Sequence, residues 1–266
     1  REWLPRFATG ELIAELGLTE SQSGSDPRSI QTTATRAGGD WVINGHKMWI
    51  SNGPILTDLI VVARVDKGLS LFVVPMNSPG VTVSKPTELL LRGAGGVSEI
   101  HLADVRVPAR HRLGGDDEHS LANALKTVTI GRLATSARML ASCELAYHLT
   151  VDFVKNRKAF GQRVFDFQNT QFKLASMKTD IAVGRGYLDQ LMRRAATGGV
   201  DPVETSMAKL WLSEMEARLL DECVQLHGAM GVSNEYPLSK MYAFARVHRI
   251  FLGTSEIQRV TIARTI

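Results

Sequence analysis

The chain has 266 residues, of which 44% are hydrophobic and 22% charged, and its formal net charge is +4. This composition is that of a globular protein of one or two domains. The small basic excess is spread along the chain without a run of five like charges, so nothing favours binding to nucleic acid. Because no apolar run approaches a membrane span and the first residues do not form a secretory signal, we expect a cytoplasmic protein.

Residues 1–112 are predicted to form a β domain. Short runs of β-branched and aromatic residues alternate with turn residues, and no helical period joins them. The runs cover residues 30–37, 41–43, 47–51, 59–65, 69–74, 80–84 and 98–102. A short helix over residues 5–16 is expected to lead in. The predicted architecture is a small antiparallel β-barrel or sandwich.

Residues 113–266 are predicted to form an up-down bundle of four or five α-helices, because apolar residues recur there at helical spacing. Gly198 and Gly199 end the second helix, and Asp201 with Pro202 begins the third. The expected helices run to about residue 156, over 169–196, over 202–226, over 237–245 and from 254 or 255 onwards. The chain is therefore expected to be an α+β protein.

The two cysteines, Cys143 and Cys223, lie within apolar helical patterns. Cysteines of this kind are usually buried and unpaired. Both are therefore expected to be free thiols in a reducing compartment. No pair of cysteines or histidines has the spacing of a metal-binding motif, so the sequence predicts no metal site.

Two polar motifs in the β half indicate a binding site for a planar ring. The first, LTESQSGSD over residues 18–26, has by itself the composition of an ordinary surface loop. The second, GHKMWISNG over residues 45–53, places a tryptophan among β-formers and a serine two residues later. Such a strand can offer one flat apolar face and one hydroxyl, which is what a flavin ring requires.

Together the two motifs resemble the acyl-CoA dehydrogenase family, whose members carry Leu-Thr-Glu-Pro-x-x-Gly-Ser-Asp followed by Gly-x-Lys-x-Trp-Ile-Thr-Asn-Gly. The resemblance implies that Leu18 and Thr19 lie at the polar edge of the flavin of FAD, with the Thr19 hydroxyl near N5. It places Trp49 and Ser51 beside the ring. It also implies that Ser25 reaches the CoA part of a substrate.

The helical half continues the resemblance with NRKAFGQ over residues 156–162. In the family, Arg-Lys-x-Phe-Gly lies where two subunits meet. The resemblance therefore implies that Arg157 contacts the pyrophosphate of a neighbouring subunit's FAD, a role that suits its bidentate guanidinium. Phe160 and Gln168 are expected to line the same cofactor.

Two later segments also match positions that contact FAD in the family. Gln225 and Gly228 fit the pattern Gln-x-x-Gly-Gly-x-Gly, in which glycines let the backbone approach the cofactor closely, and Ala229 replaces the second glycine. Thr254 and Glu256 match the contacts made from the last helix. The helical half most resembles the long-chain and isovaleryl types.

The positions of the family's catalytic base carry no base in this chain. One branch has a glutamate directly before Gly-Thr, where this chain has Leu252, and the long-chain and isovaleryl types have it in a Glu-Arg pair, where this chain has Gly131 and Arg132. The backbone N–H of Leu252 would still polarise a thioester carbonyl. Arg132 and Gly253 are expected to help hold the substrate.

The resemblance implies oxidation of an acyl-CoA thioester to the trans-2-enoyl-CoA, with hydride passed to flavin N5 and the base elsewhere. The expected partners are acyl-CoA, an electron-transfer flavoprotein or similar acceptor, and further subunits in a homotetramer built as a dimer of dimers, or a homologous partner subunit. One alternative is a base-less FAD-binding subunit of a hetero-oligomeric dehydrogenase. Another is different flavin chemistry on the same fold, such as desulfination or hydroxylation. The family also carries an N-terminal helical domain, which is expected to lie outside the present sequence.

Overall fold

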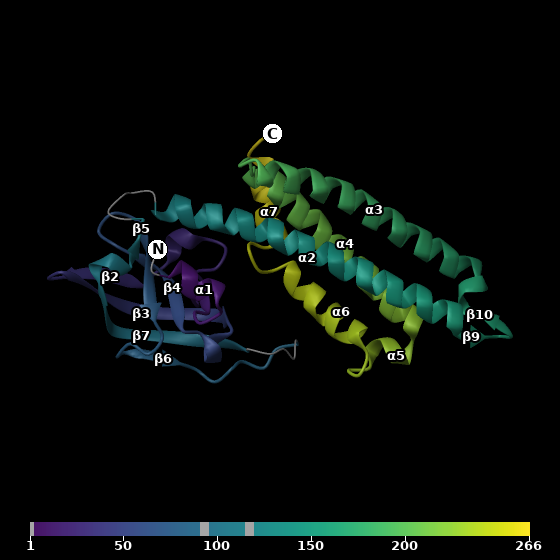
Figure 1. The fold of residues 1–266 in the computed structure, drawn as a ribbon, viewed down its shortest axis with the longest axis horizontal. Helices are drawn as coiled ribbons and strands as arrows, with labels where there is room; N and C mark the ends of the chain where they lie inside the picture. Colours follow the sequence, from purple (N-terminus) through teal and green to yellow (C-terminus); the bar gives the residue numbers. More distant parts are fainter. Residues whose placement is uncertain (1–2, 91–95, 115–119) are drawn as a thin grey trace. The chain divides into compact units, whose positions relative to one another are not determined.

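The computed structural model describes residues 3–90, 96–114 and 120–266. The chain divides into two compact units, Arg1–Leu125 and Lys126–Ile266, which Figure 1 shows as a sheet unit and a helical unit. The sequence places the division at residue 112. In the structure the first turn of the long helix that begins at Ser120 belongs to the first unit, so the division falls later.

A mixed sheet forms the first unit, with strand order β6-β7-β3-β2-β4-β5-β8 and with β1 paired to β4. Its strands are β1 (Ala14–Gly17), β2 (Thr33–Ala37), β3 (Asp40–Ser51), β4 (Asp58–Arg64), β5 (Leu69–Pro75), β6 (Val81–Val83), β7 (Val97–Pro108) and β8 (Arg112–Leu113). Most pairs are antiparallel, as predicted, but β1 and β2 each run parallel to β4. Short 3-10 turns cover Pro27–Ser29, Gly53–Ile55 and Ala109–His111.

The lead-in helix expected over residues 5–16 needs correction. Helix α1 covers only Leu4–Ala8, and residues 14–17 form β1 instead. The chain turns at Gly10, whose φ of 76° is a conformation that ends a helix. The apolar residues after it then add a strand beside β4, where pairing satisfies their backbone groups better than a short exposed helix would.

Alternating residues of β2, β3, β4, β5 and β7 build the core of the sheet unit. Ile43, Leu59, Phe72, Val74 and Ile100 are fully buried in it. This alternation is the two-residue period of strands with one face packed on a core. Strand β3 pairs with β7 along most of its length, with register shifts between Ile43 and Gly45 and between Lys47 and Ile50.

The helical unit agrees closely with the bundle that the sequence predicts. Its helices are α2 (Ser120–Asn156), α3 (Gln168–Ala196), α4 (Pro202–His227), α5 (Ala229–Val232), α6 (Pro237–His248) and α7 (Ser255–Ala263). Between α2 and α3 lie a hairpin of β9 (Lys158–Ala159) and β10 (Gln162–Arg163) and a 3-10 turn, Val164–Asp166. Side-chain caps fix two starts, Asp201 for α4 and Thr254 for α7.

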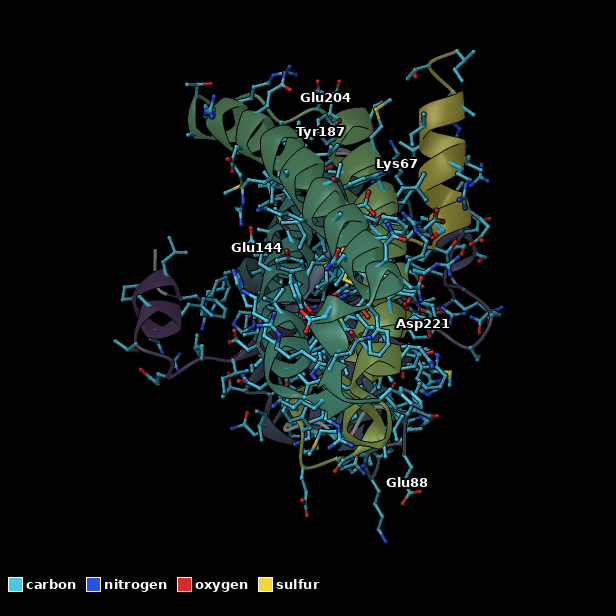
Figure 2. The ribbon with its side chains drawn as sticks, turned by 90° about the vertical axis from the view of Figure 1, so that its right-hand side faces the viewer. Lys67, Glu88, Glu144, Tyr187, Glu204 and Asp221 are labelled. Atoms are coloured by element: carbon cyan, nitrogen blue, oxygen red, sulfur yellow. The ribbon has the colours of Figure 1, made fainter. Side chains whose placement is uncertain are left out.

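Apolar faces of the long helices meet in one core, in which Met139, Leu140, Leu188, Leu212 and Met215 are among the buried members. At one end of the bundle, α3 is tied to the start of α4. There the Tyr187 hydroxyl donates to the Glu204 carbonyl at 3.2 Å, and Figure 2 shows the two residues together. None of the described helices is both long and apolar enough to cross a membrane.

The two thiols behave as the sequence predicts. Cys143 and Cys223 are free and fully buried in the bundle core. Burial raises the pKa of both, that of Cys223 to about 11, so they stay protonated and apolar in character.

Candidate active site

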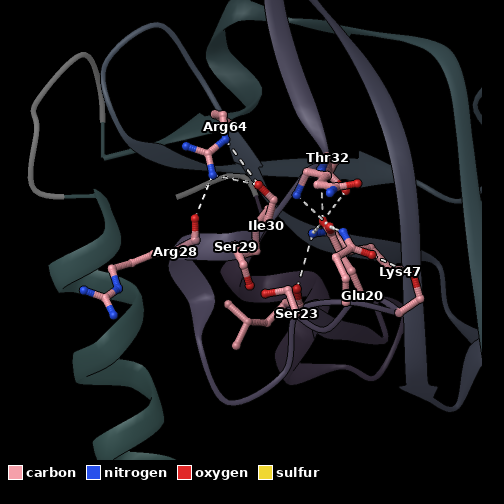
Figure 3. A network of polar contacts seen from close by, with 12 residues as sticks. Glu20, Ser23, Arg28, Ser29, Ile30, Thr32, Lys47 and Arg64 are labelled. Carbon is pink, nitrogen blue, oxygen red and sulfur yellow. Dashed lines mark hydrogen bonds and ion pairs between the residues drawn. The ribbon is translucent and has the colours of Figure 1, made fainter.

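A buried ion pair fixes the first predicted flavin-binding segment to the strand that carries the second. The Lys47 ammonium lies 2.7 Å from the Glu20 carboxylate, and the two side chains are 0% and 3% exposed. The same carboxylate accepts hydrogen bonds from the Thr32 hydroxyl at 2.6 Å and from the N–H groups of Gln31 and Thr32 (Figure 3). Every buried charge in this network is therefore paired, as burial requires.

The electrostatics of this network favour the ionised carboxylate. Desolvation works to raise the pKa of Glu20, but hydrogen bonds from Lys47, Thr32 and Gln31 outweigh it and lower the pKa to about 2. Desolvation also lowers the pKa of Lys47, against the opposing effect of Glu20. Around it, Arg64 holds the 28–30 backbone by donating to the Arg28 and Ile30 carbonyls, both at 2.8 Å.

The network places Leu18 and Thr19 beside the strand that carries Trp49. The Lys47 ammonium lies 3.4 Å from the Leu18 carbonyl, and the Met48 N–H donates to the Thr19 carbonyl at 2.9 Å. Trp49 itself has a φ of 60° and is 54% exposed. A large aromatic side chain held in this strained conformation and turned towards solvent is a surface suited to stacking. Ser51 and Ser25 are exposed as well.

In the helical unit, side chains from three helices hold the turn before α7 by its carbonyl groups. The Leu252 carbonyl accepts from Arg132 Nε at 3.0 Å and from Gln258 Nε2 at 3.1 Å. The next carbonyl, that of Gly253, accepts from Lys209 Nζ at 2.7 Å and again from Gln258 at 2.8 Å. Arg132 is held in turn by the Ser206 hydroxyl at 3.0 Å.

The backbone of this turn has a specific conformation, and the Leu252 N–H points to no backbone acceptor among the described residues. Leu252 has a φ of 54° and Gly253 a φ of 91°, a conformation that favours glycine at the second position. A Cβ at Gly253 would meet Gln258 Nε2 at 2.7 Å. Within the described residues, no backbone carbonyl accepts a hydrogen bond from the Leu252 N–H.

Gly131 and Leu252, the two positions at which the sequence predicts a missing base, lie against each other. A Cβ built on Gly131 of α2 would meet the two methyl groups of Leu252 at 3.6 and 3.7 Å. The sequence does not reveal this contact, because the residues are far apart in the chain. Neither partner of this contact can accept a proton.

Two cations border the apolar contact. Desolvation lowers the pKa of Arg132. Desolvation, followed by the nearby charge of Arg132, lowers the pKa of Lys209 to about 8, and Lys209 is fully buried. Sequence reasoning missed Lys209, since a lysine within a helix gives no local sign of burial. The cations hold the turn and give it a positive surrounding that suits the polarised oxygen of a thioester.

The predicted pyrophosphate ligand lies at the far end of the bundle from this turn. Figure 1 shows the β9–β10 hairpin at one end and α7 at the other. Arg157, which is exposed, lies between the end of α2 and the hairpin, and its carbonyl accepts from the Val164 N–H at 2.8 Å. At the tip, Phe160 has a φ of 52° and is 97% exposed. Gln168 begins α3 close by in the chain.

The segment that follows α4 combines an open backbone with an unpartnered polar atom. Gly228 caps α4 with a φ of 59°, and a Cβ there would meet nothing within 4 Å. Beside it the buried His227 stacks on Phe153 at 4.2 Å, and its Nε2 has no hydrogen-bond partner. Gln225, Gly228 and Ala229 are exposed. The exposed loop and the unpartnered Nε2 of His227 are consistent with the contact to a polar cofactor that the sequence predicts for these residues.

Thr254 and Glu256 stand at the start of α7. Thr254 caps the helix through the Ile257 N–H at 3.3 Å, and Glu256 lies in its first turn. Beside them the Ser255 hydroxyl is buried without a partner. The structure thus brings the predicted residues into three groups, one on the sheet unit and one at each end of the bundle.

The chain has a mixed-sheet unit followed by an up-down helical bundle, and it carries the flavin-binding motifs described above. These features are those of the flavoprotein class that the sequence predicts. A sequence model of the acyl-CoA dehydrogenase middle domain matches residues 15–105, and one of the acyl-CoA dehydrogenase C-terminal domain matches residues 121–266. The chain belongs to the acyl-CoA dehydrogenase family.

Individual relatives agree. The mitochondrial long-chain specific acyl-CoA dehydrogenase of Rattus norvegicus is 36% identical over 273 residues, covering 100% of this chain and 63% of that protein. The CarC subunit of the caffeyl-CoA reductase-Etf complex of Acetobacterium woodii is 31% identical, covering 98% of this chain and 70% of that subunit. A glutaryl-CoA dehydrogenase of Mycobacterium smegmatis, solved in complex with FADH2, superposes with a TM-score of 0.95 at 32% identity, covering 99% of this chain and 68% of that one. The chain thus spans less than two thirds of the rat enzyme's length.

Proposed function

We propose that the protein oxidises acyl-CoA thioesters to their trans-2-enoyl products, with FAD as cofactor and with a catalytic base that is neither residue 131 nor residue 252. The observation that carries this proposal is the turn at Leu252. Its carbonyls are clamped by Arg132, Lys209 and Gln258, while its N–H is left available. That arrangement suits a donor to a thioester carbonyl, which the reaction needs whatever the base is.

The cofactor's contacts are proposed from the exposed Trp49 and Ser51 and the half-buried Thr19. Trp49 offers a face for the flavin ring, and the Thr19 and Ser51 hydroxyls offer donors at its edge. Ser25 is proposed to contact the CoA part of the substrate. FAD, when bound, supplies the acceptor for the hydride from the β-carbon.

The protein is proposed to be a homo-oligomer in which Arg157 binds the FAD of a second subunit. The hairpin next to Arg157 lies at the opposite end of the bundle from the α7 turn (Figure 1). One cofactor contacting both groups is therefore most simply shared between two copies. The fully exposed Phe160 at the hairpin tip fits such an interface. A dimer of dimers is the assembly proposed, as in the sequence prediction.

The contact between Gly131 and Leu252 favours a second candidate function. In this candidate the protein is an FAD-binding subunit without its own base, and it works with a homologous partner subunit. Gly131 has no side chain, and the methyl groups of Leu252 lie next to it, so neither residue offers a group that could act as a base. In either case reduced flavin needs an acceptor, and an electron-transfer flavoprotein is proposed, since the related CarC subunit belongs to an Etf complex. A cytoplasmic location is proposed because both buried cysteines are free thiols.

Anaerobic mixing of the full-length protein with short, long, branched and steroid-like acyl-CoA thioesters tests the proposal by the bleaching of bound flavin. Reduction by the protein alone supports a base elsewhere in the same protein. Flavin that stays oxidised until a homologous subunit is added supports the second candidate. A protein that remains colourless with added FAD refutes both.

The base itself is tested by Leu252→Glu, with Leu252→Gln as the control of equal size that cannot act as a base. If the protein has no base of its own, as in the second candidate, flavin reduction by Leu252→Glu should exceed that by Leu252→Gln by roughly 10²–10⁴-fold, the usual effect of a general base. Equal rates in two variants that both bind acyl-CoA and still reduce flavin would support a base elsewhere in the protein. Two variants that bind acyl-CoA without reducing flavin would favour other flavin chemistry such as desulfination or hydroxylation.

The cofactor contact is tested by Arg157→Ala, with Lys158→Ala as the neighbouring exposed control. Loss of a charged hydrogen bond to phosphate costs about 1.5–3 kcal/mol, so we expect the affinity for FAD to fall roughly tenfold to hundredfold in Arg157→Ala only. Equal affinities in the two variants would remove Arg157 from the proposed site.

A further inference from the structure

Three side chains on one surface of the sheet unit converge where the sequence shows no metal motif. His46 of β3 stands directly opposite His101 of β7 in the antiparallel register, and Glu99 lies two residues before His101 on the same face. The Glu99 carboxylate oxygen Oε2 lies 3.1 Å from His46 Nε2 and 3.8 Å from His101 Nε2. The two imidazole rings are stacked, with centroids 4.3 Å apart and planes inclined by 14°.

Rotation of the side chains can bring these three residues to the geometry of a tetrahedral metal site. One potential ligand atom from each of the three residues lies within 4.8 Å of the other two. Zinc binds nitrogen and oxygen ligands at about 2.0–2.1 Å, which separates neighbouring ligand atoms by ~3.3 Å. The ligand atoms therefore need to move by no more than about 1.5 Å, which side-chain rotation on fixed strands provides.

The backbone beneath the cluster is well fixed. Between two register shifts of the β3–β7 ladder, His46 and its neighbours pair in regular register with β7. Lys47 and Ile100, which point to the opposite face, are both fully buried and anchor the two strands. The Glu99 N–H donates to the Ser84 hydroxyl at 2.9 Å, which ties the ligand strand to the segment after β6. Ligands on rigid strands lose little entropy when they bind.

We propose that His46, Glu99 and His101 form a zinc site, with water as the fourth ligand. Two imidazole nitrogens and one carboxylate oxygen match the ligands of zinc, whereas Mg²⁺ and Ca²⁺ prefer oxygen alone. The side chains are 29%, 36% and 54% exposed for His46, Glu99 and His101, so an ion can enter and keep its water. The ion cross-links β3 to β7, the strand pair that leads to Trp49. This site is independent of the proposed flavin chemistry.

Calorimetric titration of the full chain with Zn²⁺ alone tests the proposal, and Co²⁺ provides a second readout because its visible absorption reports tetrahedral coordination. We expect one ion per chain and a rise in the melting temperature of the sheet unit with Zn²⁺ but not with Mg²⁺. Loss of a hydrogen bond to a metal ligand already weakens metal binding about 10–100-fold. His101→Ala and Glu99→Gln should therefore each weaken binding by at least about tenfold.

The matched control is His148→Ala, which removes an exposed histidine of the helical unit. It should bind Zn²⁺ as the unchanged chain does. Melting in the absence of metal checks that each variant folds. The proposal is overturned if the unchanged chain binds no Zn²⁺, if His101→Ala binds it equally well, or if His148→Ala removes the binding.

Discussion

Replacement of Lys47 by methionine is expected to destabilise the sheet unit more than any single surface change. Methionine has a similar length and keeps the aliphatic contacts of the lysine, but it removes the charge that neutralises Glu20. The carboxylate would then be buried, at 3% side-chain exposure, with neutral hydrogen-bond donors from residues 22, 31 and 32 but no cation. Removing one partner of a buried ion pair costs about 3–5 kcal/mol, because the other charge is left uncompensated.

That cost differs from the net contribution of the intact pair. The fall in the pKa of Glu20 from 4.5 to about 2 corresponds to about 3 kcal/mol, since each pKa unit represents about 1.4 kcal/mol. The desolvation of Lys47, whose own pKa falls, reduces the net value to about 1–2 kcal/mol. Removing Lys47 alone therefore costs more free energy of unfolding than the intact pair contributes.

Urea unfolding followed by tryptophan fluorescence measures the effect, because Trp3, Trp41 and Trp49 all lie in the sheet unit. Lys67→Met is the control, since Lys67 is an exposed lysine of the same unit (Figure 2). We expect Lys47→Met to lower the free energy of unfolding by about 3–5 kcal/mol and Lys67→Met by less than about 0.5 kcal/mol. Costs within 1 kcal/mol of each other would refute the role assigned to the ion pair.

Three further outcomes follow from the same structure. Because the pKa of Glu20 is depressed in the folded state, its contribution is present above pH 4.5 and is lost as the pH falls towards about 2; the stability difference between the unchanged chain and Glu20→Gln, measured by urea unfolding, should shrink over that range and not above it. Gly131→Ala should stabilise the helical unit by about 0.5–1 kcal/mol in thermal melting, because the added Cβ meets Leu252 at ordinary contact distance; a loss of stability would mean that the contact is overpacked. Cys143 and Cys223 should resist thiol reagents near neutral pH and react only after denaturation, since burial raises the pKa of both; stoichiometric labelling of the folded chain would contradict this.

Most of the fold could be predicted because its local signals agree with its tertiary packing. The helical period continues through α2, α3 and α4, and capping residues such as Asp201 lie at their starts. The lead-in segment could not be predicted correctly, because its fate depends on a parallel pairing with β4 that only the assembled sheet provides. A short apolar run is compatible with a helix or with a strand, and the presence of a partner strand determines which of the two forms.

The site was less predictable than the fold. Motif resemblance pointed to Trp49, Thr19 and Arg157, but it says nothing of what holds them. Lys209 is one buried support that the sequence hides, because burial of a charge depends on long-range contacts. The cluster of His46, Glu99 and His101 likewise cannot be predicted from local spacing, because its members come together through the register of two strands.

Gly131 and Leu252 should be considered together, because they are in contact. A side chain added at Gly131 would be in contact with the Leu252 methyl groups from its Cβ onwards. The leucine at 252 therefore limits which side chains fit at 131. A glutamate placed at 131 would have to pass those methyl groups, whereas one placed at 252 starts from the clamped turn itself. The two positions therefore should not be equivalent as sites for a restored base. Gly131→Glu should need Leu252→Ala beside it to act, and Leu252→Glu should not need any change at Gly131.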